Sequence, residues 1–296
     1  MKNIKILKIT FLMLLLPLLV NGQKAEIHIK TTKLSDNFYM LEGSGGNIGI
    51  FVGDDGVFMI DSQYAPLTPK ILNAIKKITP KSVSYLLNTH WHGDHTGGNE
   101  NMNAVGAKII SHENVRKRMS SIQNIRGREI KPSSKKALPN VTFTDDITFH
   151  LNGDTIFVTH IHNAHTDGDV LVYLMNNNII HAGDAYFQGK FPFIDVTSGG
   201  SIDGYINGIK KIILLSDNNT IIIAGHGTKT SNKETLKEYL KMLMTLKNRV
   251  QLEIDKGKKL ESVKNNITIT KEFTSYNGWI TEEKIRIAIY KSLIKK

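Results

Sequence analysis

Short apolar runs broken by Gly, Asp and Asn alternate with helical patterns from about residue 34, which is typical of strands and helices joined by turns. The first round predicts strands over 38–43, 47–53, 57–62, 83–90 and 107–111 and helices over 66–79, 98–105 and 112–120. Asp54-Asp55-Gly56 marks a hairpin turn. Residues 121–140 are polar, basic and rich in turn formers, so they predict a loop or a broken helix.

A second round repeats this organisation. It predicts strands over 141–146, 147–153, 155–161, 169–175, 178–184 and 220–225 and helices over 202–216, 233–256 and 281–294. Two similar halves of mixed strands and helices favour an α+β fold class, in which two mixed β-sheets pack face to face with helices outside. We expect one domain over residues 23–296, of which 231–296 form a helical C-terminal extension.

Residues 1–22 predict a secretory signal peptide rather than part of the fold. Lys2, Lys5 and Lys8 precede an apolar run over 9–20, and Val20-Asn21-Gly22 offers a cleavage site. The run is short for a bilayer span, which needs about 20 residues, so we expect no stable membrane insertion after cleavage. An uncleaved anchor and a buried N-terminal helix are the alternatives. The predicted location is therefore periplasmic or secreted.

Composition narrows the classes of protein. Of the 296 residues 40% are hydrophobic and 22% charged, which excludes a wholly disordered chain, a collagen-like fibre and a multi-span membrane protein. The absence of cysteine excludes disulfides and thiol nucleophiles. The net charge of +11 comes from dispersed lysines, which favours a solvated surface over nucleic-acid binding. Solvated charge is also the favoured interpretation for Lys190 and the basic segment 116–136, although substrate contact stays open.

The segment His90-Trp91-His92-Gly93-Asp94-His95 concentrates potential metal ligands directly after the predicted strand 83–90. Residues two apart in an extended segment point the same way, so His90 and His92 can hold one ion together. After the chain turns, Asp94 and His95 can face a second ion. Imidazole and carboxylate groups suit zinc where thiolates are absent. Trp91 is expected to pack.

Further candidate ligands follow other apolar strands and lie among small residues: His165 in AHTDGD, Asp184 in HAGD and His226 in AGHG. His160 and His162 compete with His165, but they fall within a predicted strand rather than after it. Ser62 and Ser198 lack the sequence context of a nucleophilic triad.

The ordered set HWHGDH, AHTDGD, AGD and AGHG resembles the metallo-β-lactamase superfamily of binuclear metal hydrolases over nearly all of residues 23–296. GGNIGIFVGDDGVFMID and FPFIDVTSGGS are similar to secreted members. The resemblance implies a metallo-β-lactamase-like domain with the αββα sandwich fold. It also implies two Zn2+ ions per chain. The first ion would be held by His90, His92 and His165, and the second by Asp94, His95 and His226. Asp184 would bridge the two ions. Asp61 would support this loop without binding metal.

The resemblance further implies a hydrolase whose metal-bound hydroxide, oriented by Asp94 as the catalytic residue, attacks a carbonyl. The expected net positive charge of the metal centre favours a small anionic substrate. Export favours a β-lactam or a similar cyclic amide or ester. Superfamily β-lactamases with a cysteine ligand have it where Asp184 stands, and their substrate-binding lysine falls at Phe187 here. A glyoxalase II-like thioesterase or a lactonase is therefore the alternative, and a nuclease is less favoured.

Overall fold

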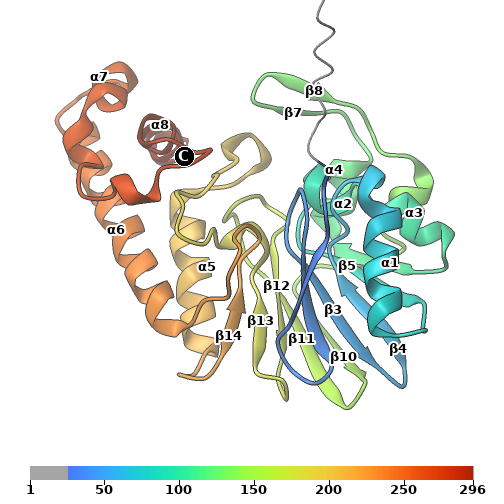
Figure 1. The fold of residues 1–296 in the computed structure, drawn as a ribbon. Helices are drawn as coiled ribbons and strands as arrows, with labels where there is room; N and C mark the ends of the chain where they lie inside the picture. Colours follow the sequence, from blue (N-terminus) through green and yellow to red (C-terminus); the bar gives the residue numbers. More distant parts are fainter. Residues whose placement is uncertain (1–25, 296) are drawn as a thin grey trace, which may run out of the picture.

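The computed structural model describes residues 26–295, so the predicted signal peptide lies outside the described residues. Two β-sheets pack face to face, and helices cover their outer faces (Figure 1). This arrangement is the αββα sandwich that the sequence predicts, and the fold class is confirmed.

The first sheet has seven strands in the order β1-β2-β3-β4-β5-β6-β9. Their bounds are Lys30–Lys33, Phe38–Glu42, Ile48–Gly53, Gly56–Ile60, Val83–Asn88, Lys108–His112 and Val141–Phe143. β1 to β4 form an antiparallel meander, whereas β4, β5, β6 and β9 run parallel. Parallel strands end at the same edge, so the segments that follow β4 and β5 emerge side by side.

The second sheet has five strands in the order β10-β11-β12-β13-β14. Their bounds are Asp146–Leu151, Asp154–His160, Val170–Leu174, Ile179–His181 and Ile221–Ile223. The first four strands are antiparallel neighbours, and β14 pairs parallel to β13. The loops that follow β13 and β14 therefore leave from one edge.

Side-chain alternation explains why each sheet can be covered on both faces. In β4, Phe58 and Ile60 point into the core between the sheets, while Val57 and Met59 join the outer cluster beneath α1. In β12, Val170, Val172 and Leu174 point inward, and Leu171 faces the helices on the other side. β4 and β12 are therefore almost continuous apolar runs, because both faces of each strand are buried.

The six predicted helices form, and two short helices that were not predicted lie at 93–96 and 260–265. Their bounds are α1 Thr68–Ile78, α2 Gly93–Thr96, α3 Asn99–Ala104, α4 Glu113–Met119, α5 Ile202–Leu215, α6 Lys233–Asp255, α7 Leu260–Asn265 and α8 Glu282–Ile294. Side-chain caps from Ser201, Asn232 and Thr281 begin α5, α6 and α8, because each side chain accepts a hydrogen bond from an otherwise unpaired backbone N–H. Within residues 26–295, no helix combines the length and apolar character needed to cross a bilayer.

Two further segments differ from the sequence-based expectation. The expected loop or broken helix over 121–140 contains a β-hairpin, with β7 at Gln123–Ile125 and β8 at Arg128–Ile130, followed by a 3-10 turn at Lys135–Ala137. The hairpin projects above the ends of the sheets (Figure 1). β1 was not expected either, because its sequence KTTK is polar and it lies at the sheet edge.

Candidate metal centre

The seven predicted ligands come together at one edge of the sandwich. His90, His92, Asp94 and His95 lie in the connection from β5 through α2, and His165 lies between β11 and β12. Asp184 is in the 3-10 turn Gly183–Ala185 after β13, and His226 follows β14. The strand ends thus deliver ligands from both sheets to one place.

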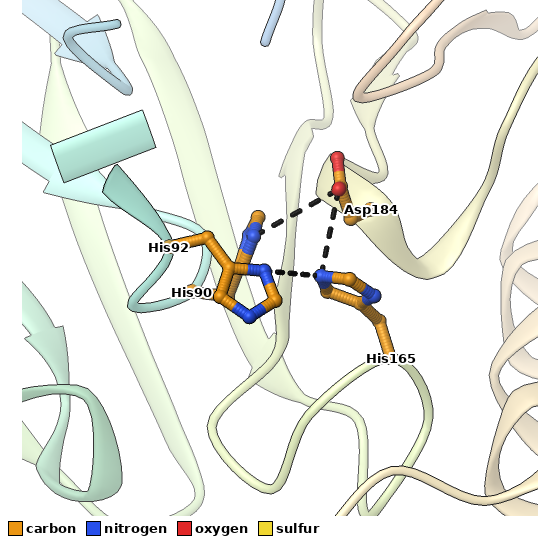
Figure 2. A group of neighbouring side chains, drawn as sticks. All are labelled: His90, His92, His165 and Asp184. Carbon is orange, nitrogen blue, oxygen red and sulfur yellow. Dashed lines mark hydrogen bonds and ion pairs between the residues drawn. The ribbon is translucent and has the colours of Figure 1, made fainter. Parts of the chain in front are cut away.

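The first group consists of His90, His92, His165 and Asp184, each with one donor atom within 4.8 Å of those of the others. All four side chains are buried and point toward one another (Figure 2). His92 Nδ1 lies 2.8 Å from His165 Nε2, and Asp184 Oδ2 lies 3.5 Å from the same His165 nitrogen. Three imidazoles and a carboxylate make a zinc-type donor set.

The second group consists of Asp94, His95 and His226, whose donor atoms also lie within 4.8 Å of one another. His226 Nε2 is 3.2 Å from Asp94 Oδ2, and His95 Nε2 is 3.8 Å from that oxygen. His95 is fully buried, whereas Asp94 and His226 are partly exposed. This group is therefore more open to the solvent than the first group.

Asp184 lies between the two groups. Its Oδ1 is 3.1 Å from His95 Nε2, and its Oδ2 is 3.5 Å from Nε2 of both His165 and His226. Among the described residues, His90 Nε2, His95 Nε2 and Asp184 Oδ1 are buried atoms without a hydrogen-bond partner. Such atoms are costly unless something binds them, and a cation fits this role.

The charges in the cluster also indicate that it can bind a cation. Burial alone would lower the pKa of His95 and of His226, but the neighbouring carboxylates together outweigh it, with Asp184 the largest contributor among them. The pKa of His95 therefore lies well above its usual value, and that of His226 is about 9. His90 and His165 show the opposite balance: burial holds the pKa of His90 well below its usual value and lowers that of His165 to about 4. The cluster attracts positive charge while keeping two imidazoles neutral, as metal binding requires.

Asp61 holds the ligand loop from behind, which is the role that the resemblance implies. Its Oδ2 lies 2.7 Å from His95 Nδ1 and accepts a hydrogen bond from Thr89 Oγ1, and its Oδ1 accepts one from Thr89 N. Asp61 has a φ of 63°, a strained conformation for a residue other than glycine. The strain aims the carboxylate at His95 and fixes the orientation of its ring.

Asp195 supports His92 in a comparable way, and sequence reasoning missed it. His92 Nε2 lies 3.1 Å from Asp195 Oδ2, while His92 Nδ1 faces the other ligands. Ser198 Oγ and Thr197 Oγ1 donate hydrogen bonds to the two oxygens of Asp195. The only sequence signal is its place in FPFIDVTSGGS, the segment that is similar to secreted superfamily members.

Comparisons with known proteins agree with this geometry. The family model described as the metallo-beta-lactamase superfamily matches residues 41–250. The chain belongs to the metallo-β-lactamase superfamily. A curated relative, the metallo-beta-lactamase type 2 of Bacteroides fragilis, is 23% identical over 232 residues, covering 72% of this chain and 86% of the relative.

One further curated relative and one solved structure also match the chain. The hydroxyacylglutathione hydrolase of Erythrobacter litoralis is 31% identical over 107 residues, covering 36% of this chain and 35% of that protein. The structure of a metallo-beta-lactamase from Pontibacter korlensis matches with a TM-score of 0.62 and 22% identity, covering 73% of this chain and 99% of that one. The relatives are hydrolases, and this superfamily member carries a His/Asp metal-binding cluster.

The remaining candidates lie elsewhere. His160 and His162 are outside the ligand cluster: the His160 ring stacks on His112 at a centroid distance of 3.8 Å, and His162 is exposed. Trp91 is buried in a small apolar cluster, as expected. Ser198 donates its hydrogen bond to an aspartate rather than to a histidine, so it does not form a nucleophilic triad.

Glycine permits the closest approach in the cluster. A Cβ at position 225 would come within 2.0 Å of Asp184 Oδ1, so only glycine lets the β14 connection pass beside the bridging carboxylate. A Cβ at Gly46 would likewise come within 2.0 Å of His95 Cε1. The space that the ligands need thus sets the residues that border them in the folded chain.

A cavity of about 710 Å³ opens over the cluster, a volume that suits a small-molecule ligand. Asp94, Asp184 and His226 form its floor, together with His92. The walls include three cations, Arg126, Arg128 and Lys190, and the aromatic residues Tyr64, Phe187, Phe191, Phe193 and Trp279. Arg126 and Arg128 of the basic segment line this pocket, because the β7–β8 hairpin carries both to it.

Proposed function

We propose that this protein is an exported hydrolase that holds two zinc ions and acts on the carbonyl of a β-lactam or a similar cyclic amide or ester. The observation that carries the proposal is the pair of donor groups sharing one carboxylate. Asp184 contacts both groups, because its Oδ1 lies 3.1 Å from His95 and its Oδ2 lies 3.5 Å from both His165 and His226. Buried nitrogens of His90 and His95 have no hydrogen-bond partner among the described residues.

The donors suit zinc because they combine imidazole nitrogen with carboxylate oxygen and include no thiolate. His90, His92 and His165 would hold the first ion, Asp94, His95 and His226 the second, and Asp184 would bridge them. When bound, the ions would supply a water of lowered pKa and a Lewis acid for the substrate's carbonyl oxygen.

Asp94 is the carboxylate best placed to take part in the reaction. Its side chain is 24% exposed and lies on the pocket floor beside His226. Its pKa is lowered to about 2, because His95 and a hydrogen bond with His226 outweigh the effect of burial. As a carboxylate at neutral pH it can orient the attacking water and hold that water's proton at an oxygen.

The name of the Bacteroides fragilis relative supports a β-lactam substrate, since the match covers 86% of that protein. A second candidate is a thioesterase of the hydroxyacylglutathione hydrolase type, which the Erythrobacter litoralis match favours. Asp184 also supports this second candidate, because the β-lactamases with a cysteine ligand carry the cysteine, and not an aspartate, at this position. A lactonase shares the same requirement for an activated carbonyl.

A panel of substrates tests the proposal. Purified, zinc-loaded protein would be assayed on nitrocefin, benzylpenicillin, a carbapenem, a homoserine lactone and lactoylglutathione, with a phosphodiester beside them. We expect β-lactam turnover that a chelator removes and added zinc restores. Rapid turnover of lactoylglutathione or the lactone without any β-lactam turnover would favour the second candidate. Turnover of the phosphodiester alone would contradict carbonyl hydrolysis.

Export is a separate part of the proposal and rests on residues 1–22. N-terminal sequencing of protein from its native host should find a chain that begins near residue 23 in the periplasmic or secreted fraction. A full-length chain in the cytosol would contradict export and would leave the hydrolase proposal intact.

A further inference from the structure

We propose that Arg126 recognises the anionic group of the substrate, so that the site selects carbonyl compounds with a carboxylate close to the reacting group on an apolar body. The inference deepens the proposed function and rests on its metal centre. The residues that carry it are Arg126, Phe193 and Trp279, which we call the aromatic–arginine stack.

The stack lies one aromatic ring away from the metal ligands. Phe193 contacts two of them, with ring centroids 5.8 Å from His92 and 5.4 Å from His165. The guanidinium carbon of Arg126 lies 4.3 Å from the centre of the Phe193 ring and 3.9 Å from that of Trp279. Arg126 lines the same pocket as the ligands Asp94, Asp184 and His226, so a substrate held at the metals would share the pocket with this cation.

Stacking leaves the hydrogen-bonding capacity of Arg126 available. A cation–π contact uses the face of the guanidinium and none of its N–H donors, so the five N–H groups can still donate hydrogen bonds. Within residues 26–295, Arg126 has no carboxylate at ion-pair distance. A guanidinium matches a carboxylate in two parallel hydrogen bonds, which makes it a better recognition group than an ammonium.

The backbone at Arg126 indicates that its side chain is needed there. Arg126 and Gly127 form the two-residue turn between β7 and β8, with φ angles of 54° and 79°. Such turns prefer Asn-Gly or Asp-Gly, because most side chains disfavour a positive φ at the first position. An arginine at this position is unfavourable for the turn, and a functional role for its side chain accounts for it.

The other cations of the pocket are less suited to this role. Lys190 Nζ donates a hydrogen bond to the carbonyl oxygen of Asn277 at 3.2 Å. Arg128 lies on the same hairpin without the aromatic contacts that hold Arg126. Phe187, where related enzymes have a lysine, stacks on the ligand His226 at a centroid distance of 5.2 Å and brings no charge.

The test measures binding rather than turnover. Cobalt-substituted protein would be titrated with 2-sulfanyl-3-phenylpropanoate and with 2-phenylethanethiol, which share a thiol and an aromatic group but differ in the carboxylate. Binding is followed by the thiolate-to-cobalt absorption band. We expect the wild type to bind the carboxylate probe about 10- to 100-fold more tightly.

Arg126→Asn is the decisive variant, because asparagine suits the turn and removes the guanidinium. It should lose at least about tenfold of the carboxylate preference, with unchanged binding of the neutral thiol. Arg126→Lys should restore only part of it, and the matched control Arg128→Asn should keep most of it. No preference in the wild type, an unchanged preference in Arg126→Asn, or an equal loss in Arg128→Asn would overturn the inference. The absence of a thiolate band from both probes in the wild type would contradict the metal centre itself.

Discussion

The histidines at the centre of the ligand cluster are buried, whereas Arg126 and Trp279 in the pocket walls are exposed and lie on connecting segments. His90, His95 and His165 are at most 1% exposed, and each lies beside a core strand. Trp279 is 59% exposed, and Arg126 lies on a hairpin outside both large sheets. The superfamily match over residues 41–250 includes Arg126 and Phe193 and ends before Trp279.

This difference separates metal binding by the cluster from substrate recognition by the pocket walls. The cluster depends on the fold, since a change in either sheet would displace a ligand. The aromatic–arginine stack of Arg126, Phe193 and Trp279 depends on side chains that reach the pocket from surface segments, so it can change without loss of the core. We therefore expect variants of the cluster to alter zinc content and variants of the walls to alter substrate affinity.

The largest expected effect is that of Asp184→Ala. Loss of the carboxylate between the two proposed zinc ions would leave their repulsion uncompensated. The protein should then retain about one zinc ion and lose activity by about 10²- to 10³-fold or more. Metal analysis after dialysis and turnover on the best panel substrate measure both, and circular dichroism checks the fold. Asp36→Ala, at a fully exposed aspartate, is the control. Full activity in Asp184→Ala would show that this aspartate only shapes its turn.

Asp195→Asn should have the next largest effect. The carboxylate fixes the ring of His92 through Nε2, and loss of such a contact weakens metal binding by about 10- to 100-fold. Competition with a chromophoric chelator would measure zinc affinity. Ser198→Ala removes one hydrogen bond to the same carboxylate and should lose less. Equal zinc affinity in wild type and Asp195→Asn would mean that Asp195 merely shapes the loop at Val196–Ser198.

The cluster could be predicted from the sequence because its ligands are local in a motif or follow apolar strands. HWHGDH supplies four of the seven, and Asp184 and His226 each come after a run of isoleucines. Strand geometry then brings them to one edge. The core strands were predictable for the same reason, since burial on both faces leaves a continuous apolar run.

The walls could not be predicted, because nothing local marks them. The β7–β8 hairpin has three-residue polar strands and an Arg-Gly turn in place of the usual Asn-Gly signal. Asp195 reaches His92 across 103 positions of sequence, so its role exists only in the folded chain. Trp279 approaches Arg126 from a region that the sequence indicated only as a helical extension.

Trp279→Ala tests whether the two regions are independent. It removes one aromatic contact of Arg126, and an exposed cation–π contact contributes about 0.5–1 kcal/mol. We expect KM for a carboxylate-bearing substrate to rise about two- to fivefold, with kcat and zinc content unchanged. Leu214→Ala, at a residue that is 83% exposed on α5, is the matched control. Loss of zinc from Trp279→Ala would show that walls and cluster form one unit.

Lys190→Ala should have the smallest effect, although Lys190 is the lysine nearest in sequence to the position where related enzymes bind the substrate carboxylate. Its ammonium is exposed and already donates to the carbonyl oxygen of Asn277. An exposed charge contributes little and is screened by salt, so KM should change by about twofold or less, and the change should shrink as salt is raised. Steady-state kinetics on a carboxylate-bearing substrate at two salt concentrations measure this. A rise in KM of tenfold or more would assign the carboxylate to Lys190 and would move the recognition group away from the hairpin.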